Sequence, residues 1–433
     1  MNLNINFNPN YKPLKIQNLN TLKIIEKSKF SQKFNIFNIQ ETEIKSILKL
    51  PCKWKQVYKI QFKKILSYTP GDSISIIAPN TTQIVDELFR FLKLKDFNLI
   101  IEHTKFKYEG SLRDFFLNVF DFNSIPKKAF FYDIKKYSKY EKVIEYLCSK
   151  EGTRDYFRID LNVLELLKIF KCKPSIYDLL MNCQIIRPRK YSLINKSENE
   201  CEILVGIIKR KIFSDYFDEN FLENIIQNLR ITYNFLKDNE NKLENNNTET
   251  IIYTKNECFN DHKKENLNID INKEKSVLKY GHISSLIKAD QFKKVSISLS
   301  ENKLLRLGNS KNILCICTGT GIAPFISFLN NKKEDQFIKI IYGFRNIEDD
   351  LLTYVNFDHR NVEIIKILSC NKIYVTDYLL DNINEINQFI SKDCQVYVCG
   401  RAEMEKKVFQ IFCDNFKDII EKKNIFLMIG VNL

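Results

Sequence analysis

The feature that most constrains this chain is the stretch from Ile313 to Leu329, which reads ILCICTGTGIAPFISFL. Its first five residues form an apolar run of strand character, Gly319 and Gly321 interrupt that run, and Pro324 stands where a helix would begin. The pattern predicts a buried strand, a tight turn and the first turn of a helix. Such a turn directs backbone N–H groups and the positive end of a helix dipole at one place, which suits a phosphate group. An ordinary strand-to-helix turn would carry the same letters.

The residues that follow favour a nucleotide-binding domain over an isolated turn. From Asn312 onward, strand-like and helix-like runs alternate with short connections: ILCIC, PFISFLNN, FIKIIYGF, VEIIKIL, DYLLDNINEINQFI, QVYVCG and EKKVFQIFCDNF. This alternation predicts a doubly wound parallel sheet that binds its ligand at the carboxyl ends of the strands. Four polar loops, three of them marked by glycine, fall at those ends, and we expect them to border one crevice: 318–320, 343–345, 369–374 and 399–402.

The first half of the chain has a different character. Short alternating runs, VYKIQF at 57–62 and SISIIAP at 73–79, predict an antiparallel barrel or sandwich, with Pro70-Gly71-Asp72 between them as a hairpin turn. Helical periodicity then dominates from Ile84 to Phe170. Strand patterns return in two further runs, at 184–194 and 201–211.

We therefore predict three parts. Residues 1–33 form a loosely ordered, Asn- and Lys-rich leader, and residues 301–433 form the α/β domain with the parallel sheet. Between them, residues 34–300 form an α+β domain, an antiparallel β-barrel with a helical insert at about 84–180 and a disordered loop at about 238–275. The loop prediction follows from a polar, Asn-rich composition with too few apolar residues to form a core.

Composition limits the classes of function. The formal net charge of +14 is compatible with an acidic partner, a nucleic acid or a membrane surface. It is also compatible with a general bias of the sequence toward lysine. No block of five or six consecutive basic residues supports nucleic-acid binding. The 12 cysteines form no CxxC pair and the four histidines are scattered, so we expect no metal site. We interpret Cys315 and Cys317 as small buried residues of a strand. Without a visible signal peptide or an apolar run near the ~20 residues of a membrane span, a cytoplasmic location fits best.

A second candidate motif, RPRKYS, covers 187–192. Strand alternation places Arg189 and Tyr191 on one face, with Ser192 on the edge beyond them. A guanidinium suits a diphosphate and a tyrosine ring suits stacking on a flat cofactor, although an exposed basic strand would have the same composition.

In the order PGD, RPRKYS, GHISS and TGTGIAPF, these motifs resemble the FAD and NADPH module of the ferredoxin-NADP reductase superfamily. The helical insert between the PGD and RKYS strands narrows the resemblance to the diflavin reductases. Within that family the chain looks most like the methionine synthase reductases, through YTPGDSISIIAPN, IPKKAFF, LCSKEGTRDYFR, KVSISL and GTGIAPFISFL. The resemblance runs from about residue 50 to about residue 410.

The resemblance implies which residues would hold FAD. Arg189 would bind the FAD diphosphate, Tyr191 would stack on the isoalloxazine, and Ser192 would hydrogen-bond near the reactive nitrogen of the flavin. The second FAD motif would hold the diphosphate through its backbone and hydroxyls, at Gly281, Ser284 and Ser285.

It also implies an NADPH site. The residues that match the phosphate-binding loops are Gly319, Thr320, Gly321 and Arg345. Those that match the group recognising the 2′-phosphate are Ser369, Lys372 and Tyr374. Cys399 matches the cysteine placed near the nicotinamide, so Ser192 and Cys399 are the candidate catalytic residues, acting by positioning and local polarity.

The implied activity is that of an NADPH-dependent flavoprotein oxidoreductase. NADPH would give a hydride to FAD, and the reduced FAD would pass electrons singly to a separate acceptor, as in a methionine synthase reductase. The acceptor would be a flavodoxin-like protein or methionine synthase, and we expect neither a nucleic acid nor a membrane as partner.

Several departures from the family pattern stand out. We expect no FMN domain, since the leader is too short to form one, and the tail IFLMIGVNL lacks the aromatic residue that covers the flavin in the family. Cys370 stands where an arginine usually helps to hold the 2′-phosphate, and Arg401 replaces an aspartate. Further substitutions affect the second FAD motif and the glycine turn, at Ile283, Leu286 and Thr318.

Two other functions remain open from the sequence. One is a reductase of the branch that serves cytosolic iron-sulfur assembly, which also has RPR before the aromatic residue. The other is a non-catalytic scaffold that keeps the fold and a partner surface, which the missing FMN domain and the altered loops would suit.

Overall fold

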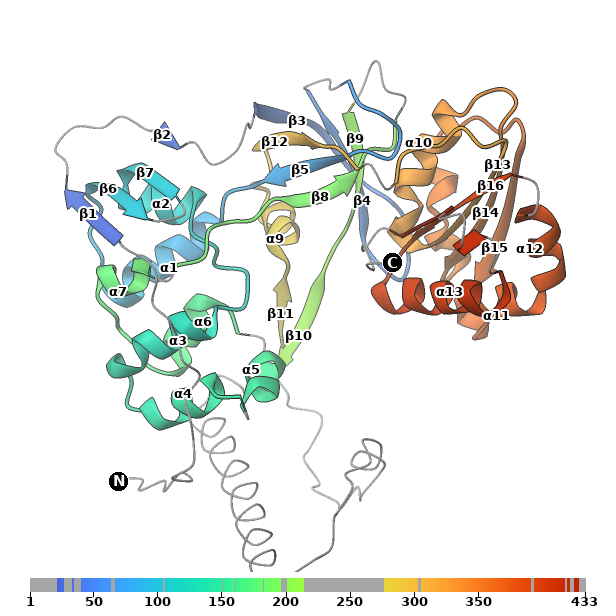
Figure 1. Ribbon diagram of the computed structural model, residues 1–433. Helices are drawn as coiled ribbons and strands as arrows, with labels where there is room; N and C mark the ends of the chain where they lie inside the picture. The colour runs from blue at the N-terminus through green and yellow to red at the C-terminus, as the bar shows by residue number, and fades with distance from the viewer. Residues whose placement is uncertain are drawn as a thin grey trace, which may run out of the picture.

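The computed structural model describes these residues: 22–26, 33–34, 40–63, 67–103, 106–150, 152–159, 161–181, 183–195, 201–213, 276–302, 305–390, 393–416, 419–420 and 424–427. The loop expected at about 238–275 lies outside them. A strand-rich barrel lies in the middle of the molecule, with the helical insert on one side and the parallel-sheet domain on the other (Figure 1). The fold class expected from the sequence is confirmed.

The barrel is an antiparallel sheet whose first and last strands approach each other. Its strands, in spatial order, are β8 (Arg189–Ser192), β5 (Ser73–Ile77), β12 (Lys294–Ser300), β3 (Gln40–Lys49), β4 (Val57–Phe62) and β9 (Cys201–Gly206). A bridge between Leu193 and Ile203 and a hydrogen bond of 3.0 Å from the Ile194 N–H to the Glu202 carbonyl join β8 to β9. The interior is filled by buried isoleucines, among them Ile60, Ile74 and Ile297, because side chains of alternating residues point inward.

The Pro70-Gly71-Asp72 turn is not the hairpin that the sequence suggested. It joins β4 to β5, and these strands are not neighbours in the sheet. Gly71 has a φ of +100°, and a Cβ at this position would stand 1.7 Å from the Leu305 carbonyl oxygen, so only glycine fits. The buried Asp72 carboxylate accepts a hydrogen bond of 2.9 Å from the Asn302 N–H. The turn therefore anchors the connection from the barrel to the parallel-sheet domain.

A two-stranded ribbon extends from the barrel and leads into a short helix. The ribbon pairs β10 (Lys209–Phe213) with β11 (Ser276–Tyr280), and α9 (His282–Lys288) follows it. In Figure 1 the ribbon runs from the barrel toward the helices of the insert.

The insert between β5 and β8 contains both helices and strands. Its helices are α1 (Thr82–Leu92), α2 (Leu112–Asn118), α3 (Lys128–Ile134), the 3-10 turn η1 (Lys135–Tyr137), α4 (Glu141–Cys148), α5 (Thr153–Ile159), α6 (Val163–Ile169) and α7 (Ile176–Met181). The prediction from helical periodicity did not include the hairpin of β6 (Asn98–His103) and β7 (Phe106–Ser111). The strand β1 (Leu22–Glu26) pairs with β6 and β2 (Lys33–Phe34) pairs with β7, which extends this hairpin to four strands. Within the predicted leader 1–33, residues Leu22–Glu26 form the strand β1.

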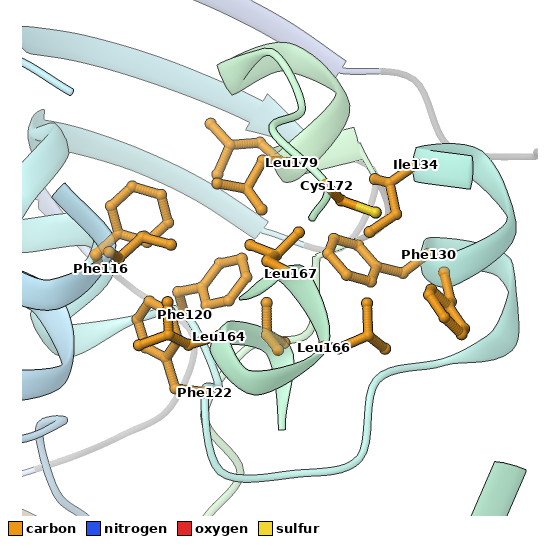
Figure 2. Packing of buried hydrophobic residues seen from close by; sticks show 14 of the residues in the cluster. Phe116, Phe120, Phe122, Phe130, Ile134, Leu164, Leu166, Leu167, Cys172 and Leu179 are labelled. Carbon is orange, nitrogen blue, oxygen red and sulfur yellow. The ribbon is translucent and has the colours of Figure 1, made fainter. Parts of the chain in front are cut away.

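The insert has a core of its own, rich in phenylalanine. Figure 2 shows side chains from α2, α3, α6 and α7 converging on one another, with Phe120 and Phe122 beside Leu164. The rings of Phe120 and Phe122 lie 4.7 Å apart between centroids. Such a contiguous apolar cluster gives this part of the chain its own source of stability.

The last domain is a parallel sheet covered on both faces. Its strands, in spatial order, are β15 (Val362–Leu368), β14 (Phe337–Phe344), β13 (Asn312–Thr318), β16 (Cys394–Cys399) and β17 (Ile425–Leu427). Its helices and 3-10 turns are η4 (Gly319–Ile322), α10 (Ala323–Asn331), η5 (Ile347–Asp349), η6 (Leu351–Tyr354), η7 (Ser369–Asn371), α11 (Val375–Asp381), α12 (Ile383–Ile390) and α13 (Ala402–Asn415). Because both faces of β13 are covered, the whole run ILCIC is buried, and the interpretation of Cys315 and Cys317 as small buried residues is confirmed.

The barrel and the parallel sheet pack directly on each other. Val57 and Leu204 of the barrel belong to the same buried cluster as Ile322 and Phe325, which follow the glycine turn. Within the part of the chain that the structure describes, no helix is both long and apolar enough to cross a membrane.

Candidate functional site

The carboxyl ends of β13, β14 and β16 lie close together at one edge of the sheet. A Cβ at Gly321 would stand 2.3 Å from the Cys399 carbonyl oxygen, and one at Gly400 would stand 2.7 Å from Thr318 Oγ1. A Cβ at Gly343 would come within 3.2 Å of Thr318 Cγ2. Side chains at these glycines would push the three strand ends apart, since the contacts are shorter than van der Waals separations.

Gly319 plays a different part in the same turn. Its φ is +54°, and nothing lies within 4 Å of the position that a Cβ would take. The turn therefore exposes backbone to open space at the point where β13 leads into η4, and α10, whose first turn contains Pro324, follows. A glycine cradle at the start of a helix fits a nucleotide phosphate, because backbone N–H groups and the helix dipole both favour an anion.

The residues expected around a 2′-phosphate gather at the ends of β14 and β15. The Cys370 N–H donates to the Arg345 carbonyl over 3.1 Å, and the Ser369 hydroxyl donates to the Phe344 carbonyl over 3.2 Å. Lys372 has a left-handed backbone with φ +59° and an exposed side chain. Tyr374 is the exposed N-cap residue of α11. The loops thus present two exposed cations, Arg345 and Lys372, at one end of the sheet.

In the barrel, β8 places the RKYS residues beside β5. Tyr191 pairs with Ile74 and Ser192 pairs with Ser73, and Ser192 is buried. Burial raises the pKa of the Tyr191 hydroxyl to about 12, with the nearby charge of Arg189 acting in the opposite direction. The phenol is therefore neutral at physiological pH, and its proximity to Arg189 agrees with the expected shared face.

The second FAD motif lies at the start of α9. The Gly281 N–H donates to the Ile208 carbonyl over 3.0 Å, and Ser284 Oγ accepts from the Ile208 N–H over 3.1 Å. Ser285 Oγ donates to the His282 carbonyl over 2.7 Å. Both hydroxyls thus hold the protein's own backbone here.

His282, which the sequence reasoning missed, joins the start of α9 to the segment that follows β5. Its Nε2 lies 2.8 Å from the Pro79 carbonyl oxygen, and its ring is buried. Burial lowers the pKa of the imidazole, and the charge of Arg189 lowers it further. The hydrogen bond to Pro79 and the charge of Asp121 act in the opposite direction. Tyr191 of the RKYS strand packs against the same apolar cluster of the barrel as Ile283 of the GHISS turn. A histidine inside the second motif was the available signal.

Cys399 lies at the buried end of β16. Burial raises its thiol pKa far above the ordinary range, and the charge of Glu405 adds to that shift. The thiol is therefore protonated at physiological pH and is unsuited to act as a nucleophile. The atom of Cys399 that lies beside Gly321 is its backbone carbonyl oxygen, whereas its side chain belongs to the buried cluster that also contains Ile322.

Two further residues at the junction of the domains escaped the sequence reasoning. The Lys55 residue is exposed, but the ammonium group of its side chain lies against Gly206, near the Thr320 methyl group. Burial of the ammonium lowers its pKa, and the charge of Arg401 lowers it further. Trp54 stacks on the Arg345 guanidinium, with 3.4 Å between the guanidinium carbon and the ring centroid. A lone tryptophan between two lysines was a weak signal, because the local pattern does not reveal a distant partner.

Comparisons with known proteins match two domain families in this order. A family model described as an FAD binding domain matches residues 60–211, and one described as an oxidoreductase NAD-binding domain matches residues 315–410. A ferredoxin-NADP+ reductase from Plasmodium falciparum, solved by crystallography, covers 92% of this chain and 99% of its own at 14% identity and a TM-score of 0.41.

The curated relatives carry names of flavoprotein reductases. The sulfite reductase [NADPH] flavoprotein alpha-component of Buchnera aphidicola from Acyrthosiphon pisum is 22% identical over 84% of this chain and 53% of its own length. The NADPH-dependent diflavin oxidoreductase 1 of Gibberella zeae is 22% identical over 83% of this chain and 57% of its own. Human methionine synthase reductase is 32% identical over 30% of this chain and 22% of its own. The chain spans about half the length of the first two relatives.

Proposed function

Because the chain carries an FAD-binding domain and an oxidoreductase NAD-binding domain and is homologous to the diflavin reductases, we propose that it transfers electrons from NADPH through FAD to a separate protein. The observation that supports the proposal most is the junction of the two domains. The glycine turn of the parallel sheet packs against β9 of the barrel, with Ile322 in one buried cluster with Val57 and Leu204. Nucleotide motifs on either side of this junction would bring two cofactors together.

FAD would be held by residues of the barrel and its following helix. The proposed groups are Arg189, Tyr191, Ser192, Gly281, Ser284 and Ser285. Since the hydroxyls of Ser284 and Ser285 bind backbone atoms here, the start of α9 would meet a diphosphate chiefly through N–H groups. The neutral phenol of Tyr191 offers a flat face for stacking, and Arg189 offers a fixed positive charge.

NADPH would be held by the strand ends of the parallel sheet. The proposed phosphate-binding groups are Gly319, Thr320, Gly321 and Arg345, with Ser369, Lys372 and Tyr374 around the 2′-phosphate. The open space beside Gly319 and the exposed cations Arg345 and Lys372 support this assignment. The two domains would extend over the predicted ranges 34–300 and 301–433, which enclose the two matched segments.

When bound, FAD would accept a hydride from NADPH and release single electrons, which is chemistry that amino-acid side chains do not supply. The protein would hold the two ring systems in register and exclude water from them. Ser192, buried at the end of β8, would donate a hydrogen bond toward the flavin. Cys399, neutral at the end of β16, would limit where the nicotinamide lies.

The acceptor would be a separate protein. Among the relatives, the local identity to methionine synthase reductases reaches 32%, whereas the longer alignments to sulfite reductase flavoproteins reach 22%. We therefore take a methionine synthase, or a flavodoxin-like protein that serves it, as the first acceptor to test. An excess of positive charge would favour an acidic acceptor, because complementary charge raises the rate of encounter.

Purification with added FAD tests this function. We expect a yellow protein that reduces ferricyanide with NADPH as electron donor. Protein that stays colourless after incubation with FAD, while circular dichroism shows it folded, would leave the non-catalytic scaffold as the better account.

A further inference from the structure

The loop between β3 and β4 of the barrel is attached to the loop that follows β14 of the parallel sheet. The N–H groups of Lys53 and Trp54 both donate to Asp349 Oδ1, each over 2.9 Å. These residues are almost 300 positions apart in the sequence, so the contact joins the two domains. Two hydrogen bonds to one carboxylate oxygen fix the backbone of the loop at Trp54.

The Trp54 ring lies under the Arg345 guanidinium, 3.4 Å from its central carbon. In this geometry one face of the guanidinium is covered. Its N–H donors lie in the plane and point outward, so stacking holds the group in place without using its hydrogen-bonding capacity. Both side chains are exposed, with Trp54 57% accessible. A ligand can therefore reach the edge of the guanidinium from solvent.

Two acids of the loop that follows Arg345 are engaged elsewhere. Asp349 Oδ1 accepts the two loop N–H groups, and Oδ2 accepts from the N–H and the side-chain amide of Asn346, each over 3.2 Å. Glu348 forms an ion pair of 3.7 Å with Lys53. Among the described residues, no carboxylate forms an ion pair with Arg345. The guanidinium is thus a positioned cation that a ligand anion can neutralise.

The stack stands beside the loop expected to recognise a phosphate. The Cys370 N–H donates to the Arg345 carbonyl, so the backbone of Arg345 is directly bonded to the turn at the end of β15. We propose that Trp54 is a positioning residue of the nucleotide site: it holds the Arg345 guanidinium for a phosphate group of an adenine nucleotide. This inference rests on the proposed NADPH function. It adds a residue of the barrel domain to a site formed otherwise by the parallel-sheet domain.

The test uses the full chain and 2′,5′-ADP, a nucleotide that carries phosphate but no nicotinamide. Isothermal titration calorimetry compares the wild type with Trp54→Ala and Trp54→Phe, and with Tyr177→Ala as a control that removes an exposed aromatic residue of α7. Because an exposed cation–π contact changes an equilibrium about two- to fivefold, we expect Trp54→Ala to weaken binding by that factor. Trp54→Phe keeps an aromatic face, and we expect it and the control to bind like the wild type.

Trp54 is the single tryptophan of the chain, so its fluorescence provides a second, local readout in the wild type. We expect an emission change that saturates with the dissociation constant found by calorimetry. An unchanged affinity of folded Trp54→Ala would overturn the inference and leave the NADPH function standing. If Trp54→Ala fails to fold, the inference is overturned instead by a wild-type tryptophan emission that does not change when the nucleotide binds. A wild type that does not bind 2′,5′-ADP refutes the proposed function itself, and the inference with it.

Discussion

Gly319 and Gly321 stand two residues apart in one turn, and the structure gives them opposite reasons to be glycine. A Cβ at Gly321 would stand 2.3 Å from the carbonyl oxygen and 2.9 Å from the carbonyl carbon of Cys399, which are backbone atoms of the next strand. A Cβ at Gly319 would touch nothing within 4 Å, but the backbone there has φ +54°. The two alanine substitutions therefore separate a packing role from a ligand-binding role.

We expect Gly321→Ala to destabilise the parallel-sheet domain by about 3 kcal/mol, since it overpacks a site whose neighbours are main-chain atoms. Gly319→Ala should reduce the free energy of unfolding by only about 1–2 kcal/mol, which is the cost of a left-handed conformation for a residue with a Cβ. Its methyl group, however, would enter the space in which we place a phosphate. We expect the affinity for 2′,5′-ADP to fall about tenfold, equivalent to about 1.4 kcal/mol.

Urea unfolding followed by circular dichroism gives the two stabilities, and calorimetry with 2′,5′-ADP gives the affinity of the folded variant. The reasoning about the cradle is refuted if Gly319→Ala binds the nucleotide as tightly as the wild type. The reasoning about packing is refuted if Gly321→Ala is as stable as Gly319→Ala.

Three further variants test the other assignments. Lys372→Ala should raise the Michaelis constant for NADPH about tenfold and hardly change that for NADH, because it removes a charge that only the 2′-phosphate uses; equal effects on both would contradict the assignment. Ser192→Ala should slow flavin reduction about tenfold or more while FAD stays bound, and loss of FAD would show a structural role instead. For His282, burial lowers the imidazole pKa, so the folded state disfavours the proton that the unfolded state takes up near pH ~6.5. The free energy of unfolding should therefore decrease as the pH is lowered below that value, and it should decrease less steeply in His282→Gln. Parallel pH profiles of the two proteins would argue against this.

Local sequence patterns were sufficient to predict those parts of the fold that depend on residues close to one another in the sequence. The run ILCIC is apolar at every position and glycines follow it, which predicted a buried strand, and β13 is a strand covered on both faces. Likewise, the motif RKYS was predicted to be a strand, and it forms β8, paired with β5.

The features that were missed depend on contacts between distant segments. The run NLIIEH of β6 contains only a short apolar block, LII, so helix and strand fit it equally, and only its pairing with β7 and β1 decides. The turn at Gly71 has the letters of a hairpin, but it packs against the Leu305 carbonyl, far along the chain, and joins strands that are not neighbours. The stack of Trp54 on Arg345 joins two loops of different domains, and neither loop reveals it alone.

The central claim is that this chain brings a nicotinamide and a flavin into contact across the junction of its two domains. Anaerobic mixing of the FAD-loaded protein with NADPH, followed by flavin absorbance, tests it most directly. The account predicts rapid bleaching of the yellow flavin by about one equivalent of NADPH. A flavin that binds to the protein but stays oxidised in the presence of excess NADPH would contradict it.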